Sequence, residues 1–351
     1  MENRIKVGVL GATGTVGQRF VQLLDGHPWF EVAFVAASER SVGQRYADAC
    51  SWKLPSPMPE AVQDLVVVEP SPDAVDARVV FSGLTSDAAE AIEPTFVQAG
   101  QAVISNASAY RMAPDVPLLI PEINADHIDL IETQRRERDW PGFIVTNPNC
   151  STIALCLALA PLEAQFGIEQ VLATTLQAIS GAGYPGVPSL DILGNLVPNI
   201  PKEETKMESE TRKIFGQRAQ DQIEPHTMTL SVTTTRVPVL EGHTESVSLK
   251  LAGNPNLDDV RAALQAYTSL PQELELPSAP CHPVVVTDDP NRPQPRLDSD
   301  LEAGMATIVG RIRPCPILGV KFILLGHNTI RGAAGASVLN AELLHARGAL
   351  P

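Results

Sequence analysis

The sequence predicts an α/β protein that begins with a doubly wound parallel sheet. Two observations lead to this prediction. Short, β-branched apolar runs alternate with helical stretches over the first 150 residues, and a glycine-rich turn follows the first run directly. After residue 167 the pattern changes to β-rich segments of alternating polarity. Because 351 residues suffice for about two domains, we expect an α+β part with a mixed or antiparallel sheet to follow.

The N-terminal part alternates predicted strands with predicted helices. Strands are expected at 4–10, 31–38, 77–84, 101–108 and 141–150. One helix follows the first strand and ends near Gly26 and Pro28, and another occupies 86–99. Each strand ends in small residues, which let a ligand approach the backbone at the carboxyl edge of the sheet.

The rest of the chain predicts a second unit, which begins with an apolar helix at 151–167. Its strands are expected around 171–180, 227–239, 245–253 and 306–314. The many prolines of 253–301 indicate irregular connections, and 326–348 predicts a C-terminal helix. We place the domain boundary between 149 and 150, so that the domains span 1–149 and 150–325.

Composition excludes several classes of protein. The formal net charge of −15 argues against a nucleic-acid partner, and no apolar run reaches the ~20 residues of a membrane helix. The N-terminal residues do not resemble a signal peptide. The five cysteines form no CxxC pair, so we expect neither a disulfide framework nor a metal site. A cytoplasmic enzyme or binding protein fits these observations best.

A G-x-x-G-x-x-G pattern at Gly11, Gly14 and Gly17 joins the first strand to the first helix. The free N–H groups and the positive dipole end of a helix suit a pyrophosphate, and glycines allow its close approach. This context favours a Rossmann-like dinucleotide site, although a tight turn without a ligand fits the same pattern.

The loop after the second strand favours NADP over NAD as the coenzyme. Ser38, Arg40 and Ser41 offer two hydroxyls and a guanidinium, which suit a 2′-phosphate. Glu39 lies where NAD-binding proteins carry an acid for the ribose 2′-hydroxyl, so it argues in the other direction. A solvated loop is the alternative for this segment.

Cys150 lies between a predicted strand and an apolar helix, in N-P-N-C-S-T. A helix N-terminus stabilises a thiolate, so we expect a lowered pKa for this thiol and backbone N–H groups free to bind an oxyanion. A cysteine in this setting is more often structural. A dinucleotide site in the same chain reverses that preference, because thiolate attack and hydride transfer form one chemistry. His243, beside Gly242 at a strand edge, is the best placed histidine to act as its base.

Motifs spread over the whole chain carry a resemblance to a known family. They are GATGTVGQRF (11–20), SNASAYRM (105–112), NPNCST (147–152), QAISGAGYPG (177–186), PKEETKMESET (201–211), TTRVPVLEGHTESV (234–247), RPQPRLD (292–298) and GHNTIRGAA (326–334). In this order they closely resemble aspartate-semialdehyde dehydrogenases of the branch typical of archaea and fungi. N-acetyl-glutamyl-phosphate reductases and glyceraldehyde-3-phosphate dehydrogenases fit NPNCST and EGHTESV far less well.

The resemblance implies catalytic roles for three residues. Cys150 would be the acyl-accepting nucleophile, Gln177 would orient the thioacyl intermediate and His243 would be the general acid/base. Arg236 would hold the substrate α-carboxylate, for which a planar guanidinium is suited. Asn149, next to the nucleophile, would also contact the substrate.

The resemblance also implies contacts for the substrate ammonium and phosphate. Glu203 and Lys206 share one face of a predicted helix, where Glu203 would meet the ammonium and Lys206 a phosphate oxygen. Glu204 is one residue away and remains an alternative to Glu203. Arg111 would join Lys206 at the phosphate.

The implied cofactor contacts come from both parts of the chain. The pyrophosphate would be contacted by Gly11, Thr13, Gly14, Thr15 and Val16, and the adenosine ribose by Ser38, Arg40 and Ser41. The second half of the cofactor would lie near Ser82, and the nicotinamide near Gly183 and Asn328. The last of these brings the C-terminal segment 326–351 against the first domain, which it would complete.

The implied activity is NADPH-dependent reduction of L-aspartyl 4-phosphate to L-aspartate 4-semialdehyde with release of phosphate, in lysine, threonine and methionine biosynthesis. The family forms dimers or tetramers through the second domain, so we expect a homodimer or homotetramer. A malonyl-CoA reductase of the same fold is the alternative. It would have no use for Arg111, Glu203 and Lys206. A dinucleotide sensor without catalysis would have no use for Cys150 and His243.

Overall fold

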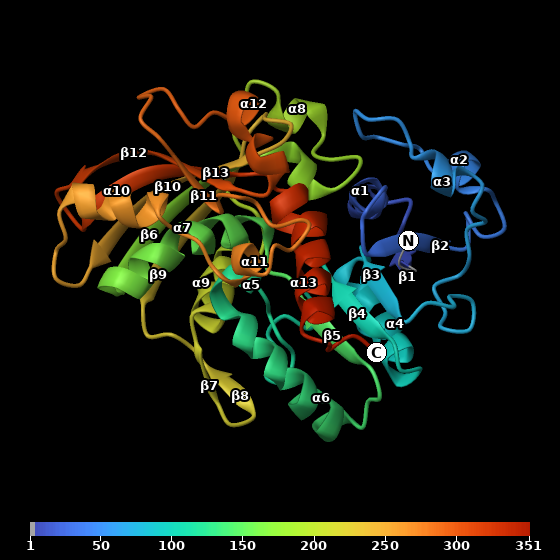
Figure 1. Cartoon of the computed structure of the whole chain (residues 1–351). Coiled ribbons are helices and arrows are strands. Elements are labelled where there is room, and N and C mark those ends of the chain that lie inside the picture. The colour runs from blue at the N-terminus through green and yellow to red at the C-terminus, as the bar shows by residue number, and fades with distance from the viewer. Residues whose placement is uncertain (1–3) are drawn as a thin grey trace.

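The computed structural model describes residues 4–351 and forms two sheet-based units side by side (Figure 1). The first unit contains a parallel sheet in the order β2-β1-β3-β4-β5. Its strands are β1 (Ile5–Leu10), β2 (Phe30–Ala36), β3 (Val79–Ser82), β4 (Ala102–Ser105) and β5 (Phe143–Thr146). This arrangement confirms the predicted doubly wound parallel sheet, with strands shorter than the predicted ranges.

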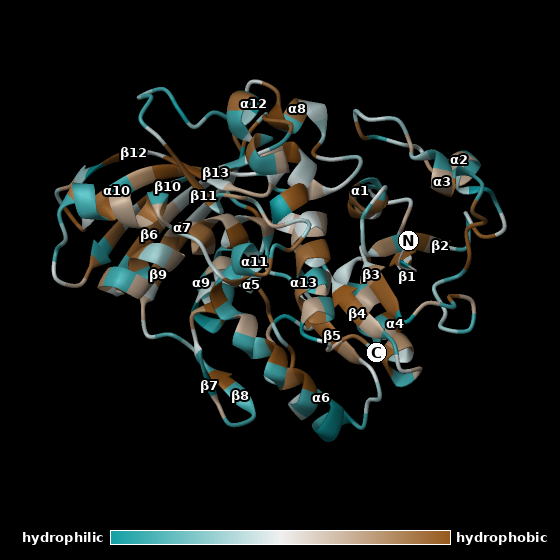
Figure 2. Ribbon diagram, viewed as in Figure 1, coloured by the Kyte–Doolittle hydropathy of each residue, from teal (hydrophilic) through white to brown (hydrophobic). Residues whose placement is uncertain are grey.

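Helices pack against this sheet. Helix α1 (Thr15–Leu24) contacts β1 and β2, α4 (Ser86–Gln98) contacts β4 and β5, and α6 (Leu130–Arg138) contacts β5. The short helices α2 (Tyr46–Ala49), α3 (Glu60–Gln63) and α5 (Pro121–Asn124) complete this unit. Strands β3 and β4 are mainly hydrophobic in Figure 2, whereas the outer end of α6 is hydrophilic, as its solvent exposure requires.

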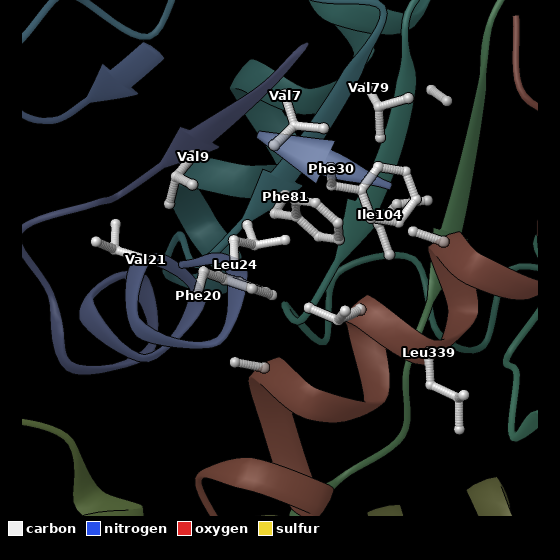
Figure 3. Close-up of a cluster of buried hydrophobic side chains, with 14 of the residues drawn as sticks. Val7, Val9, Phe20, Val21, Leu24, Phe30, Val79, Phe81, Ile104 and Leu339 are labelled. Atoms are coloured by element: carbon white, nitrogen blue, oxygen red, sulfur yellow. The ribbon is translucent and has the colours of Figure 1, made fainter. Parts of the chain in front are cut away.

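The C-terminal helix α13 (Gly335–Ala346) belongs to the core of the first unit. Leu339 packs in one buried cluster with Phe20 of α1, Phe81 of β3 and Ile104 of β4 (Figure 3). Burial of such side chains contributes ~1.5–3 kcal/mol each. We propose the domain boundary at residues 149 and 150, where the chain leaves β5 and enters helix α7.

The second unit is built on a mixed sheet in the order β11-β12-β13-β10-β6-β9. Its strands are β6 (Ile168–Gln177), β9 (Thr229–Arg236), β10 (His243–Leu251), β11 (Val284–Thr287), β12 (Thr307–Cys315) and β13 (Gly319–Gly326). The pairs β6–β9 and β11–β12 are parallel and the others antiparallel. A small hairpin, β7 (Gln217–Ala219) and β8 (Gln222–Glu224), lies apart.

Helix α7 (Cys150–Phe166) packs on one face of this sheet and is buried along most of its length. Its apolar residues face the sheet and the neighbouring helices, which explains why its sequence shows no polar face. The other helices of this unit are α8 (Ser189–Ile192), α9 (Glu203–Ile214), α10 (Leu257–Gln265), α11 (Leu270–Glu273) and α12 (Pro295–Asp298).

Two sequence expectations need correction. The C-terminal helix does not begin at 326: β13 ends there, a π-helical turn η4 (Ile330–Ala334) follows, and α13 begins only at Gly335. The segment 253–301 is not irregular throughout, because Asn256 caps α10 through Asp259 N–H and β11 extends the sheet. No helix within residues 4–351 is long and apolar enough to span a bilayer.

Candidate active site

A cavity of about 360 Å³ opens at the carboxyl ends of β1 and β3, where the strand order reverses. Open α/β sheets bind ligands at such a switch point. The cavity runs from the glycine-rich turn, through the segment after β3, to Cys150 at the first turn of α7. It is closed by loop 180–183 and by residues 328–333, so both units contribute to one site.

The glycine-rich turn needs its glycines for close packing. Gly11 adopts φ +70°, and a Cβ on Gly17 would lie 2.2 Å from the carbonyl oxygen of Gly11. Gly14 is the N-cap residue of α1 and has no side chain to cap the helix, so the first N–H groups of the helix stay available. Thr15 and Val16 line the cavity there, and Thr13 precedes them in the turn.

The loop after β2 lies in solvent. Ser38 and Arg40 are exposed, Ser41 is partly buried, and Glu39 is exposed beside them. β2 neighbours β1 in the sheet, so this loop and the glycine-rich turn leave the same edge. Two of the three side chains predicted to favour a 2′-phosphate are therefore free to meet a ligand.

Ser82 is fully buried at the end of β3 beside Glu93 and does not line the cavity, so its predicted cofactor contact stays a prediction. The neighbouring residues Leu84, Thr85 and Ser86 line the cavity instead. The sequence alone does not show whether a small residue at the end of a strand is the last buried residue of that strand or the first residue of the loop.

The predicted nucleophile and base meet. Cys150 Sγ lies 3.2 Å from Nε2 of His243, the first residue of β10. The Ala178 N–H donates to Nδ1 of His243 at 3.0 Å, so in the neutral ring the proton resides on Nε2 and points toward the sulfur. The orientation of the ring is thereby fixed by the backbone at the end of β6.

The electrostatics of the pair differ from the sequence expectation. Burial raises the pKa of the Cys150 thiol to about 12 and Glu203 adds to this, while Arg236 and Arg111 act in the opposite direction. Without ligands, desolvation therefore acts on that pKa in the direction opposite to the lowering predicted from the helix terminus. Burial, with Arg236 and His327, holds the pKa of His243 well below its usual range.

The expected oxyanion contact also changes. The side-chain oxygen of Asn149 accepts from the N–H groups of Ser151 and Thr152 and so occupies two donors at the start of α7. Gln177 Nε2 is buried and has no hydrogen-bond partner within residues 4–351. It is one of several buried donors without a partner in this region of the described chain, together with Ser151 Oγ and Thr152 Oγ1 of α7.

Gln177 and Arg236 end the parallel strands β6 and β9 and are paired in register. Both are buried, and Arg236 Nη1 donates to the Ala178 carbonyl at 2.8 Å and to Gln177 Oε1 at 3.5 Å. Burial lowers the pKa of Arg236, although Cys150 and Glu203 oppose this. The remaining guanidinium donors form a local positive group beside the thiol.

The structure separates Glu203 from Glu204. Glu203 is buried, accepts from Asn149 Nδ2 at 2.7 Å and contacts Lys206 Nζ at 3.3 Å. Glu204 instead accepts from the N–H of Thr234 in β9. Only Glu203 therefore adjoins the nucleophile's turn, and Lys206 lines the cavity.

Arg111 also lines the cavity, and its partner is a residue that sequence analysis missed. Glu210 Oε1 accepts from Arg111 Nη1 at 3.1 Å, and Arg111 Nη2 donates to the Asn106 carbonyl at 2.8 Å. Glu210 lies one turn beyond Lys206 on α9, so the helical period was the signal that pointed to it.

Two glycines that the sequence analysis did not name as site residues allow close packing at the site. A Cβ on Gly181 would lie 2.8 Å from Arg236 Nη1 and 3.1 Å from the His243 ring. A Cβ on Gly332, in η4, would lie 2.6 Å from Cys150 Cβ. Gly183 and Asn328, both named from the sequence, line the cavity, and Asn328 bridges Ser180 Oγ and the Gly242 N–H.

Comparisons with known proteins agree with this architecture. Residues 6–131 match the family model of the semialdehyde dehydrogenase NAD-binding domain, and residues 159–331 match that of the semialdehyde dehydrogenase dimerisation domain. The chain is 53% identical to an aspartate-semialdehyde dehydrogenase from Methanothermobacter thermautotrophicus, over 97% of this chain and 99% of that protein. It is 50% identical to one from Cryptococcus neoformans, over 98% of both chains.

Solved structures give the same result. The crystal structure of aspartate-semialdehyde dehydrogenase with NADP from Candida albicans matches with a TM-score of 0.91 and 46% identity, over 99% of this chain and 100% of that one. The aspartate-semialdehyde dehydrogenase II complexed with ASA from Vibrio cholerae matches with a TM-score of 0.78 and 26% identity, over 98% and 99%.

Proposed function

The chain belongs to the aspartate-semialdehyde dehydrogenase family, and we propose that it interconverts L-aspartyl 4-phosphate and L-aspartate 4-semialdehyde with NADP(H) as cofactor. The Cys150–His243 pair, at the end of a cavity that begins at a glycine-rich turn, carries this proposal. The reaction is a phosphorylating aldehyde dehydrogenation, or its reverse.

The residues of the cavity fit a dinucleotide. The turn at Gly11, where a Cβ on Gly17 would collide with the backbone, leaves the N–H groups of α1 open to a pyrophosphate. Ser38, Arg40 and Ser41 would meet the 2′-phosphate of NADP, and Gly183 and Asn328 would lie at the nicotinamide. When bound, the cofactor supplies or accepts the hydride.

Cys150 forms the covalent intermediate. In the biosynthetic direction Sγ attacks the acyl carbon of the substrate and the acyl–phosphate bond breaks, which produces a thioester on Cys150. The thiol proton leaves with the phosphate, as hydrogen phosphate. After reduction the hemithioacetal collapses and the aldehyde is released. Gln177 Nε2 orients the thioester carbonyl, because it is a buried donor at the end of β6 without a partner among the described residues.

His243 holds a proton beside the reacting atoms. Because its Nδ1 accepts from the Ala178 N–H, the neutral ring carries its proton on Nε2, and this N–H can donate a hydrogen bond to the oxyanion that develops next to Sγ. Arg236 binds the α-carboxylate and Glu203 the ammonium, supported by Asn149. These two opposite charges near the thiol set the orientation of an amino acid.

Arg111 and Lys206 bind the phosphate, and both reach the cavity near Cys150. A cation pair beside the nucleophile stabilises the leaving group in one direction and positions inorganic phosphate in the other. These two cations, together with Glu203, distinguish the proposed substrate from an acyl-CoA thioester.

We propose that the protein is a homodimer or homotetramer in the cytoplasm and serves lysine, threonine and methionine biosynthesis. The matched dimerisation domain supports an assembly. The outer face of the second sheet exposes Leu172 and Leu176 of β6, as an uncovered interface would.

An absorbance assay tests the function. NADP reduction by L-aspartate 4-semialdehyde should depend on inorganic phosphate and should be slower with NAD. No reduction with either coenzyme would refute the assignment. Oxidation of NADPH by malonyl-CoA in that case would identify the protein as a malonyl-CoA reductase.

A further inference from the structure

Glu210 is buried in the second turn from the end of α9, with 1% of its surface exposed. One oxygen accepts from Arg111 Nη1 at 3.1 Å, and the other accepts from the backbone N–H of Asn149 at 2.7 Å. A single carboxylate thus joins a cavity cation to the peptide that directly precedes Cys150.

We propose that Glu210 is a positioning residue that holds Arg111 in its phosphate-binding orientation and fixes it relative to the nucleophile's turn. This inference rests on the proposed function, in which Arg111 binds phosphate. Glu210 itself does not line the cavity, so it acts through Arg111 and Asn149 rather than by touching the substrate.

The chemistry of both contacts requires an ionised carboxylate. Arg111 and a peptide N–H are both donors, and a carboxylate offers an acceptor oxygen to each. An amide offers one oxygen and one NH₂ group. In Glu210→Gln the NH₂ group, a donor, would therefore face either the Arg111 guanidinium or the Asn149 N–H, which are donors themselves. Because Arg111 is buried, loss of this partner leaves one of its donors without a hydrogen bond.

A second residue of α9 supports the same loop. Lys213 Nζ donates to the carbonyl oxygens of Arg111, Ala113 and Val116 at 2.7–2.9 Å. The backbone of the Arg111 loop is therefore held separately from its side chain. Removal of the Glu210 carboxylate should release the guanidinium without unfolding the loop.

Two effects of Glu210 on phosphate oppose each other. Its negative charge weakens the attraction of Arg111 for an anion, whereas its hydrogen bond orients the guanidinium in advance. We expect orientation to dominate, because a guanidinium that must be ordered at the moment of binding loses affinity. Weaker phosphate binding in Glu210→Gln would therefore show that orientation dominates, and tighter binding would show that charge dominates.

The test measures phosphate binding without turnover. Cys150 of the full-length protein is alkylated with iodoacetamide at increasing concentrations of inorganic phosphate, and modification of the Cys150 peptide is followed by mass spectrometry. Bound phosphate should slow alkylation. The half-protective concentration should rise about tenfold in Glu210→Gln, since displaced contacts at active sites cost up to ~10²-fold. Glu210→Asp keeps the charge, so its half-protective concentration should lie between those of the wild type and Glu210→Gln.

Glu208→Gln is the matched control, because Glu208 on the same helix accepts from the Val232 N–H outside the cavity. It should leave the half-protective concentration unchanged. Combination with Arg111→Ala should abolish any further effect of Glu210→Gln, a non-additivity that general destabilisation would not produce. If Glu210→Gln does not fold, Glu210→Asp alone carries the comparison.

The outcomes separate this inference from the proposed function. An unchanged or lowered half-protective concentration in both Glu210 variants, with a protected wild type, overturns the positioning role alone. A wild type that phosphate does not protect overturns the phosphate site and the positioning role together.

Discussion

Nε2 of His243 lies 3.2 Å from Sγ of Cys150, although 93 residues separate them in the chain. The contact exists because α7 begins at Cys150 and β10 begins at His243, and both elements start at the same edge of the second unit. The starts of these two elements thereby bring the buried His243 into contact with Cys150, which lines the cavity.

Replacement of the nucleophile should remove turnover selectively. We expect Cys150→Ser to lower kcat at least ~10³-fold, because no other residue can form the thioester. NADP binding, measured by calorimetry, should be unchanged. Cys281→Ser is the control, since Cys281 is exposed and should be dispensable. A Cys150→Ser variant that retains a few per cent of the activity would refute the covalent route.

The raised pKa of Cys150 predicts the pH dependence of its alkylation. With a thiol pKa of about 12, the thiolate fraction increases up to that value, so the rate should rise ~10-fold per pH unit between pH 7 and 9. Glu203→Gln should accelerate alkylation, because Glu203 raises this pKa, and Arg236→Met should slow it. A plateau below pH 9 in the unliganded protein would contradict the raised pKa of the thiol.

Arg236→Lys should mainly impair substrate binding. A lysine keeps the charge but cannot replace the planar fork, and loss of a charged hydrogen bond costs about 1.5–3 kcal/mol. The KM for L-aspartate 4-semialdehyde should therefore rise roughly tenfold or more, while that for NADP stays constant. Arg313→Lys, at an exposed position of β12, is the control. Unchanged kinetic constants would exclude the carboxylate contact.

Gly181→Ala tests the packing of the site. Its Cβ would lie 2.8 Å from Arg236 Nη1 and 3.1 Å from the His243 ring, so both must move. We expect kcat/KM to fall by up to ~10²-fold, as displacements of ~1 Å do elsewhere. Melting temperature and circular dichroism should remain close to those of the wild type. Wild-type activity in a folded variant would show that the ring and the guanidinium are not tightly placed.

The coenzyme preference should depend on Arg40. We expect Arg40→Ala to raise the KM for NADP about tenfold and to leave the KM for NAD unchanged, because only NADP carries the 2′-phosphate. Arg45→Ala serves as control, since Arg45 is exposed and pairs with Asp64 instead. Equal effects on both coenzymes would place Arg40 away from the ribose.

Sequence patterns predicted the parallel sheet because its strands are buried, short and separated by glycine and proline signals. They predicted α7 because its sequence is a long apolar run that ends at Gly167. They did not predict β13, because its apolar run follows β12 closely and its pairing with β10 is non-local. They misplaced the start of the C-terminal helix, because the small residues at 326–334 are compatible with a helix but are needed here for contact with α7, as Gly332 shows.

The candidate residues of the site could be named from motifs, but their relations could not. Glu203 and Glu204 are indistinguishable by composition, and only the rotation of α9 places Glu203 at Asn149. The role of Glu210 depends on two contacts with residues 61 and 99 positions away. Likewise, the pKa of Cys150 depends on burial, which a local sequence does not reveal.

The most direct test of the account is to trap the thioester. The protein is mixed with L-aspartate 4-semialdehyde and NADP in the absence of phosphate and analysed by peptide mass spectrometry. We predict stoichiometric formation of NADPH together with an aspartyl group on Cys150, and added phosphate should release it as L-aspartyl 4-phosphate. NADPH formation that continues with phosphate while Cys150 never carries an acyl group would contradict the covalent mechanism.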